Sequence, residues 1–455
     1  MASSGSSVLQ AGPPARLGRR ALLGGAVAAA GLGLSGCAGL TSRVTSTSRG
    51  SRDRVTFQTY GTDVETAVYA KLARRFEQAH RGVTVDLTVV PFSEASTGID
   101  AGLVSGTAPD VFRVDYPTMG VYASTGVLLD LSDPLAELAD DVSKPFIDAV
   151  SEGGRLFGIP QHVDTSALVY RPDVLRDAGI GAVPDRPEDA WSWEEFSAVA
   201  DKLRDAAPDG NAAFAVNWQA LGAFRWLNWL FMAGGHLYTR DVSRSTLRTP
   251  EATKALDFTR SFFDQGWVPQ TTSTKAATFP DALFTSGKLA MLFAGNFLLP
   301  SFVQTIGKRF DYAVTYLPRD ARRASELGGN ALVATKDATN PDLVADFLEF
   351  MAAPTQMRDF CAAATLLPTR RSLLERRLDF ADSPELMPVY ADQVTTIQSR
   401  DVADVTTASF AEINLALANE LEESFLSGRS SRKTLGALAE QVDESASLNR
   451  QDVAG

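Results

Sequence analysis

The sequence has little cysteine and little histidine, with two cysteines and three histidines in 455 residues. Cys37 lies near the start of the chain, so a single further cysteine remains and an internal disulfide framework is excluded. The histidines His80, His162 and His236 are far apart and show no metal-ligand spacing. Cys361 lies in an apolar run, which favours a buried small residue over the alternative of a reactive thiol.

An excess of positive charge and the common nucleotide and nucleophile motifs are also lacking. The formal net charge is −12, which argues against nucleic acid and against a peripheral protein held to anionic lipid. No Walker A loop, GxSxG elbow or internal repeat is found in the sequence. A GxGxxG match at 31–36 has no strand before it, so we interpret it as a chance match.

The most apolar stretch, 21–34, is too short for a membrane-crossing helix and follows Arg16, Arg19 and Arg20. This is the layout of an export signal, and the run LSGC ending at Cys37 resembles the bacterial lipobox. The resemblance implies a signal peptide at 1–36, an acylated (palmitate-type) Cys37 and a flexible tether over 37–53. The alternatives are a simply secreted protein, and either Sec or twin-arginine export.

The ordered chain is expected to open with a βαβ unit. A strand-like run at 55–60 is followed by a cap at Thr62 or Asp63, by a helix and by a second strand at 83–90. Such a unit predicts a parallel sheet, and about 400 residues are too many for one core, so two lobes are expected. Ser192 with Glu195 predicts a capped helix, Asn340 a second one, and the chain after residue 401 is expected to be helical.

Several segments together resemble the extracellular solute-binding proteins of bacterial ABC importers, in the branch that captures sugars and oligosaccharides. Each piece alone is weak, but the set covers almost the whole chain in order. The segments are FEQAHRGVTV (76–85), GTAPDV (106–111), GIPQHVDTSALVY (158–170), GG (234–235), FTSGKLAM (284–291), LGGN (327–330) and LPTR (367–370).

The resemblance implies a two-lobed α/β fold of the periplasmic-binding-protein type (type II), with a hinge and a ligand cleft between the lobes. Lobe 1 is expected over 54–163 with a return segment near 298–345, and lobe 2 over 164–297 with a helical 346–455. It further implies a monomer outside the cell membrane, anchored through Cys37, that delivers a mono- or oligosaccharide to a permease. No catalysis, cofactor, metal or nucleic acid is expected.

Candidate ligand-binding residues follow from the ends of the predicted strands. Sugars offer hydroxyls and apolar ring faces, which suit carboxylates, amides and aromatic rings. Tyr60, Gly61, Thr62 and Asp63 follow the first strand, although capping alone also explains the last two. Further candidates on the first lobe are Phe92, Asp115 and Tyr116, for which core packing or a solvated loop are the alternatives.

The other candidates come mainly from the resemblance. Asp164 stands where the maltose-binding branch has a ligand-contacting acid, with a turn-capping Asp as the alternative, and Gln161 and His162 precede it, a structural role being the alternative for His162. Asn296 and Phe297 match a motif that usually has Trp in place of Phe297. The remaining candidates are Trp218 in a loop-like position, Gly329 for close backbone approach to the ligand, Asn330 as a hydroxyl partner, and Arg370, for which a surface ion pair is the alternative.

Two other functions stay open at this stage. A binding protein for glycerol phosphate or a polyamine is the first, and an exported carbohydrate-active enzyme is the second. The adjacent carboxylates at 140–141 and 194–195 are the obvious acid pairs, but neighbours on a helix point in different directions, which favours solvated faces.

Overall fold

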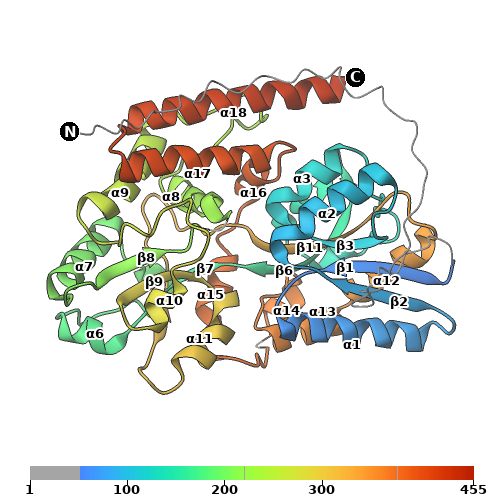
Figure 1. The fold of residues 1–455 in the computed structure, drawn as a ribbon, viewed down its shortest axis with the longest axis horizontal. Coiled ribbons are helices and arrows are strands. Elements are labelled where there is room, and N and C mark those ends of the chain that lie inside the picture. The colour runs from blue at the N-terminus through green and yellow to red at the C-terminus, as the bar shows by residue number, and fades with distance from the viewer. Residues whose placement is uncertain (1–51, 220, 377, 455) are drawn as a thin grey trace, which may run out of the picture. The chain divides into compact units, whose positions relative to one another are not determined.

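The computed structural model describes residues 52–219, 221–376 and 378–454. The predicted signal peptide (1–36), Cys37 and nearly all of the predicted tether (37–53) lie outside these residues. Within them the strands form two larger sheets, each with its own helices (Figure 1). The predicted α/β architecture is confirmed.

The first sheet has five strands in the order β2-β1-β3-β11-β6. β1 pairs in parallel with β2 and β3, whereas β11 is antiparallel to both β3 and β6. The predicted βαβ unit is confirmed, with a capping box between Thr62 and Glu65 at the start of its helix α1. The strands are β1 (Arg54–Thr59), β2 (Thr84–Val89), β3 (Val111–Asp115), β6 (Gly158–Asp164) and β11 (Gly328–Ala334).

Helices pack against this sheet through aromatic side chains, including Phe57 and Phe76, whose rings both contact Phe347. Cys361 is buried, as predicted. The elements around this sheet are α1 (Asp63–Ala79), α2 (Phe92–Ser105), α3 (Tyr116–Ser124), α4 (Leu138–Asp141), α5 (Lys144–Ala149), the hairpin β4 (Ser151–Glu152) and β5 (Arg155–Leu156), α12 (Pro341–Ala352), α13 (Pro354–Ala364) and α14 (Arg371–Leu374).

The second sheet has four strands in the order β10-β7-β9-β8. Its central strand β9 is buried along its whole length, and Phe293 on it contacts Phe196, Phe214 and Trp229. The strands are β7 (Ser166–Tyr170), β8 (Ala212–Val216), β9 (Leu289–Gly295) and β10 (Ala313–Thr315).

The remaining helices belong with the second sheet or follow it in the chain. The predicted Ser192–Glu195 capping box opens α7. These helices are α6 (Pro172–Asp177), η1 (Pro187–Asp189), α7 (Trp193–Ala206), η2 (Gly222–Trp226), α8 (Leu227–Met232), α9 (Pro250–Asp264), α10 (Asp281–Thr285), η3 (Asn296–Leu298), α11 (Leu299–Ile306), α15 (Met387–Val394), α16 (Ser399–Val405), α17 (Phe410–Leu426) and α18 (Ser431–Ala454).

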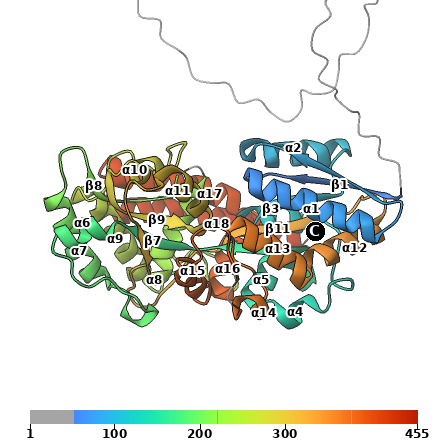
Figure 2. The same ribbon diagram turned by 90° about the horizontal axis from the view of Figure 1, so that it is seen from below.

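The division of the chain between the sheets differs from the predicted boundaries at two places. β10 lies inside the predicted return segment 298–345, but it pairs with β7 of the second sheet. Helices α12 and α13 lie inside the segment 346–455 predicted for lobe 2, apart from the first residues of α12, but they contact α1 and β6 (Figures 1 and 2). A three-residue strand carries no local signal of the sheet that it will join, and an amphipathic helix carries none of the sheet that it will cover. The lack of such signals explains both differences from the predicted boundaries.

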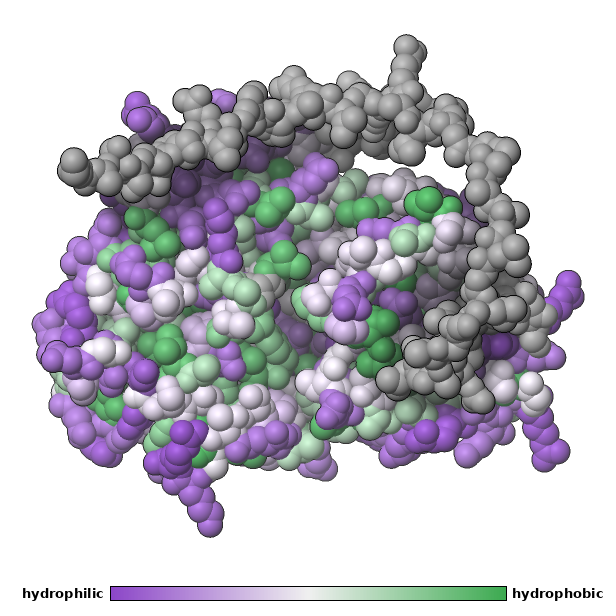
Figure 3. Space-filling model, viewed as in Figure 1, coloured by the Kyte–Doolittle hydropathy of each residue, from purple (hydrophilic) through white to green (hydrophobic). Residues whose placement is uncertain are grey.

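Hydrophilic residues gather along the edge of the face drawn in Figure 3, and apolar residues are more frequent toward its middle. Within the described ranges no helix is both long and apolar enough to cross a membrane.

Gly120 on α3 lies directly against the chain between α16 and α17. A Cβ added there would overlap the backbone oxygens of Thr406 and Thr407. We expect Gly120→Ala to lower the free energy of unfolding by about 3 kcal/mol, because a tight backbone contact has no room for a methyl group. Urea unfolding measures the change.

Gly98 on α2 is the matched control, because a Cβ added there would meet nothing within 4 Å. Gly98→Ala is expected to leave stability unchanged or to raise it by about 0.5–1 kcal/mol, since alanine favours a helix. Equal unfolding midpoints for the two variants would contradict the close contact at Gly120.

Candidate functional site

Three polar side chains meet where strands β1, β3 and β11 reach one edge of the first sheet. Tyr60 follows β1, Asp115 ends β3, and Asn330 on β11 pairs in register with Asp115. The Tyr60 hydroxyl and the Asn330 amide both donate to the Asp115 carboxylate. The Asn330 amide also donates to the Tyr60 hydroxyl at 2.8 Å. The structure therefore brings these three predicted residues together in one hydrogen-bonded group.

A buried ion pair between Arg113 and Glu65 contacts this hydrogen-bonded group and holds it in place. Arg113 on β3 donates to Asn330 Oδ1 at 2.6 and 3.0 Å, to the Tyr60 carbonyl at 2.6 Å and to Glu65 Oε1 at 2.7 Å. Burial acts to raise the pKa of Glu65, but Arg113 and the Thr62 backbone lower it by more, so Glu65 stays ionised. No motif in the sequence indicated Arg113, which stands between two apolar residues in β3.

Asp115 keeps its role as a hydrogen-bond acceptor in this setting. Burial raises the pKa of its carboxyl, while the bonds from Tyr60 and Asn330 and the charge of Arg113 act in the opposite direction. These bonds fix the orientation of the carboxylate, which suits it to accept from a ligand hydroxyl.

Asp164 lies where the chain passes from the first sheet to the second. It ends β6, and after Thr165 the chain continues as β7. The Asn296 amide donates to Asp164 Oδ1 at 3.2 Å, and the Thr165 N–H donates to Asn296 Oδ1 at 3.1 Å. His162 Nε2 is 3.5 Å from Asp164 Oδ2. The structure thus connects Asp164 to Asn296, which follows β9 of the second sheet.

A second polar group on the side of the second sheet was missed in the sequence. Glu326 accepts from Ser166 Oγ at 2.5 Å and from Asn228 Nδ2 at 2.6 Å, and its Oε1 lies 3.5 Å from Arg225 Nε. The Arg225 guanidinium also lies 5.8 Å from the ring centre of the predicted Phe297. A segment rich in aromatic residues surrounds Arg225, so the sequence favoured a core helix there.

The predicted residues Phe92 and Gly61 lie at the same edge of the first sheet as Tyr60. Phe92 is half exposed, with its ring centre 5.2 Å from that of Tyr60, so it is available at the edge. Gly61 has φ +145°, and a Cβ there would lie 2.8 Å from Arg113 Nη1. Only glycine fits beside the Arg113 side chain at that φ.

Gly329 and Gln161 occupy their positions for reasons other than the predicted contact with a ligand. Gly329 has φ +100°, and a Cβ there would lie 2.5 Å from the His162 carbonyl oxygen, so its close approach is to β6 rather than to a ligand. Gln161 is fully buried at the irregularity where β11 slips against β6. Bulges of this kind redirect side chains and are common beside functional sites.

Trp218 and Arg370 are not brought together with the residues above, and each has partners within the protein. Trp218 is fully buried, donates from Nε1 to the Thr272 carbonyl at 2.7 Å and stacks on Phe425 at 5.1 Å. Arg370 donates to the Ala352 carbonyl at 2.8 Å and to Asp141 at 3.1 Å, which is the ion pair considered as its alternative.

Tyr116, another predicted ligand contact, also has a partner within the protein. Its side chain is fully buried, and its hydroxyl donates to the His162 carbonyl at 3.0 Å. It therefore ties α3 to β6 beneath the edge, where it is not open to a ligand.

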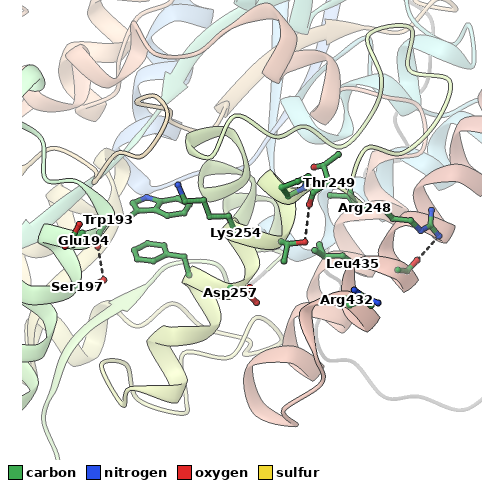
Figure 4. Close-up of a pocket in the computed structure, with 14 residues that line it drawn as sticks. Trp193, Glu194, Ser197, Arg248, Thr249, Lys254, Asp257, Arg432 and Leu435 are labelled. Atoms are coloured by element: carbon green, nitrogen blue, oxygen red, sulfur yellow. Dashed lines mark hydrogen bonds between the residues drawn. The ribbon is translucent and has the colours of Figure 1, made fainter.

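A groove of about 1010 Å³ lies elsewhere, between α7, α9 and α18 (Figure 4). Its main aromatic ring, Trp193, is stacked on Phe258 with centres 4.1 Å apart, which covers one face. Its Lys254 is paired with Asp320 at 2.5 Å. The Trp193 ring face and the Lys254 ammonium thus have partners within the protein, which makes this groove a weaker candidate than the strand edges.

One carboxylate of each acid pair considered for catalysis has a structural partner. Glu195 accepts from the Ser192 backbone N–H at 2.7 Å as part of the cap of α7. Asp141 pairs with Arg370 and accepts from Ser372 at 2.6 Å. In the part of the chain that the structure describes, no group of three His, Cys, Asp or Glu side chains is arranged to hold a metal ion.

Comparisons with known proteins agree on one family. The sequence profile of the bacterial extracellular solute-binding proteins matches residues 60–358. The diacetylchitobiose-binding protein DasA of Streptomyces coelicolor is 23% identical over 310 residues, covering 67% of this chain and 70% of its own. The lactose-binding protein of Rhizobium radiobacter is 22% identical over 308 residues, covering 65% and 69%.

Solved structures show the same fold. The sugar-binding protein MalE of Xanthomonas citri superposes with a TM-score of 0.75 at 22% identity, covering 88% of this chain and 98% of its own. The GacH receptor of Streptomyces glaucescens, solved unliganded and with acarbose, gives 0.73 at 21% identity over 87% and 98%. The two-lobed periplasmic-binding-protein fold predicted from the sequence is confirmed.

Proposed function

The chain belongs to the bacterial extracellular solute-binding protein family, and from this premise we propose that it captures a mono- or oligosaccharide and delivers it to an ABC permease. The ligand would lie at the edges of the two sheets, between the Asp115 group on one side and the Arg225 group on the other.

The observation that carries the proposal is the pairing of oriented carboxylates with nearby aromatic rings. Asp115 is held by Tyr60 and Asn330, and Phe92 packs beside Tyr60 at the same edge. Carboxylates accept hydrogen bonds from sugar hydroxyls, and rings cover the apolar faces of a sugar. Relatives are named for lactose, diacetylchitobiose and maltodextrin, which supports a sugar over other solutes.

Transport would follow from closure of the two lobes about the segments that cross from one sheet to the other. A ligand that contacts both edges favours the closed form only through its higher affinity for that form. Closure would bury the sugar and form the surface that the permease reads. No turnover of the sugar is part of this proposal, and the family is one of binding proteins.

We further propose that the protein works outside the cell as a monomer anchored through an acyl group on Cys37. The LSGC run supports the anchor. A relative from Streptomyces antibioticus, 26% identical over 322 residues, is named a lipoprotein. An acylated N-terminus would leave the binding fold in water beside its permease.

A thermal-shift screen against a library of neutral, acidic and amino sugars tests the proposal. A ligand that binds the folded state alone stabilises it by RT ln(1 + [L]/Kd), so a micromolar sugar at millimolar concentration adds about 4 kcal/mol. We expect a clear rise in Tm with one class of sugar. A rise with polyamines or glycerol phosphate and none with any sugar would contradict the choice of ligand, and hydrolysis of a glycan would contradict the binding role.

A further inference from the structure

Arg225 is a nearly buried arginine whose donors have few acceptors. Its side chain is 11% exposed, and it forms an ion pair with Glu326, whose Oε1 lies 3.5 Å from Nε. That distance is too long for a strong hydrogen bond, and Nε is buried without a partner. A buried donor that is left unsatisfied costs folding free energy. A binding role would explain an arginine in this position.

The surroundings of Arg225 point to the proposed site. Burial lowers the pKa of Arg225, and the charges of Glu326, Asp164 and Asp115 act to raise it, so both site aspartates lie within its electrostatic reach. The guanidinium is framed by aromatic rings, with centroids at 4.8 Å for Phe224 and 5.8 Å for Phe297.

Other polar atoms beside Arg225 lack partners as well. Arg225 lines a small cavity with Ser166, Asn217 and Asn228. Asn228 Oδ1 and Asn217 Nδ2 are buried and have no hydrogen-bond partner in the described part of the chain. Buried amides are normally satisfied, so a cluster of unmet donors and acceptors indicates a place that a polar ligand completes.

The charges around the site favour an uncharged ligand. Arg113 is paired with Glu65, and Arg225 faces Glu326, so each arginine is matched by a glutamate. Asp115 accepts from Tyr60 and Asn330, and Asp164 accepts from Asn296 and lies 3.5 Å from His162 Nε2. Neither aspartate forms an ion pair with an arginine in the described residues, so an anion brought beside them would be repelled.

We propose that Arg225 is the residue through which the second-sheet side binds the sugar, and that Glu326 makes it select neutral sugars over uronates and sugar phosphates. The inference rests on the proposed function and specifies its ligand. A sugar hydroxyl both donates and accepts, so adjacent hydroxyls can donate to Asp115 or Asp164 and accept from the Arg225 fork. A carboxylate can only accept, and it would compete with Glu326 for the same guanidinium.

The test is a calorimetric titration of the purified full chain with matched probes. Galactose is compared with galacturonate, glucose with glucuronate, and lactose and maltotriose with trigalacturonate. We expect the wild-type protein to bind at least one neutral probe about 100-fold more tightly than its acidic counterpart. Arg225→Met is expected to weaken that binding by about 10- to 100-fold, the range for hydrogen bonds to a charged group.

Stability measured without ligand separates binding from folding. Arg225→Met leaves the buried Glu326 carboxylate without its cation and should lower the Tm, and adding Glu326→Gln should recover part of that loss without restoring the affinity for the sugar. The matched control is Arg171→Met, whose guanidinium pairs with Asp173 at 2.6 Å and lies over Phe310 on the same half of the fold. This control should lower the Tm and leave the Kd within about twofold, as expected away from the site.

Glu326→Gln and Arg225→Lys complete the test. Glu326→Gln removes the carboxylate that faces Arg225, so the ratio of neutral-probe to acidic-probe affinity should fall about 10-fold. Arg225→Lys should bind the neutral probe with intermediate affinity, because lysine keeps the charge and loses the parallel donors of the guanidinium. The inference would be overturned by equal affinity of wild type and Arg225→Met, by a wild-type preference for uronates, or by an unchanged ratio of neutral-probe to acidic-probe affinity in Glu326→Gln. If no sugar binds the wild-type protein, the proposed function fails first.

Discussion

Asp115→Ala is expected to weaken sugar binding by 100-fold or more while the protein stays folded. The Asp115 carboxylate is oriented by Tyr60 and Asn330, so it meets a ligand without further ordering. A hydrogen bond to a charged group contributes about 1.5–3 kcal/mol, and a carboxylate that accepts two of them accounts for the expected loss. Isothermal titration calorimetry with the sugar found by thermal shift measures it.

The stability of a second variant, Asp115→Asn, separates a loss of binding from a loss of folding. Because burial raises the folded-state pKa of Asp115, its ionisation opposes folding above that pKa, and stability rises as the pH falls through it. Asp115→Asn should therefore not lower the Tm at neutral pH. Asp130, which accepts from Ser132 at 2.6 Å in a loop of the same half, is the control, and Asp130→Ala should bind as wild type. Equal binding by Asp115→Ala and Asp130→Ala would refute the role of Asp115.

Arg113→Met is expected to lower the free energy of unfolding by about 3–5 kcal/mol, the cost of leaving one member of a buried ion pair alone. Glu65 would keep a buried carboxylate without its cation, and Asn330 and the Tyr60 carbonyl would lose their donor. Urea unfolding at neutral pH measures the effect.

The pH dependence and a double variant distinguish this cause from simple loss of packing. The folded-state pKa of Glu65 is lowered, so its contribution is present above its unfolded pKa of about 4.3 and is lost as the pH falls through the folded pKa. The difference in the free energy of unfolding between wild type and Arg113→Met should therefore become smaller in acid. Adding Glu65→Gln to Arg113→Met should recover part of the stability, and a double variant no more stable than Arg113→Met would contradict the ion-pair account.

Local signals in the sequence were enough for the framework of the fold. The βαβ unit and the caps at Thr62, Ser192 and Asn340 depend on residues a few positions apart, and all are present. The placement of Asp115 at a strand end follows from the same local logic. Asn330 joined it because antiparallel pairing of β11 with β3 puts the two in register.

Long-range contacts account for what the sequence did not predict. Arg225 meets Glu326, a residue about a hundred positions away, and no spacing in the chain signals such a pair. Trp218 was expected in a loop facing the ligand, but α17 brings Phe425 onto its ring. Arg370 was assigned by resemblance, and its partner Asp141 comes from a short helix that has no motif of its own.

In the proposed function, one sugar is bound by residues from both sheets at the same time. Titration calorimetry of wild type, Asp115→Ala, Arg225→Met and the double variant with one neutral sugar measures whether both sheets contribute. We expect one site per chain, a large loss of affinity in each single variant, and a coupling between the two substitutions because closure on the ligand needs both edges. Unchanged affinity in either single variant would contradict a site shared between the sheets.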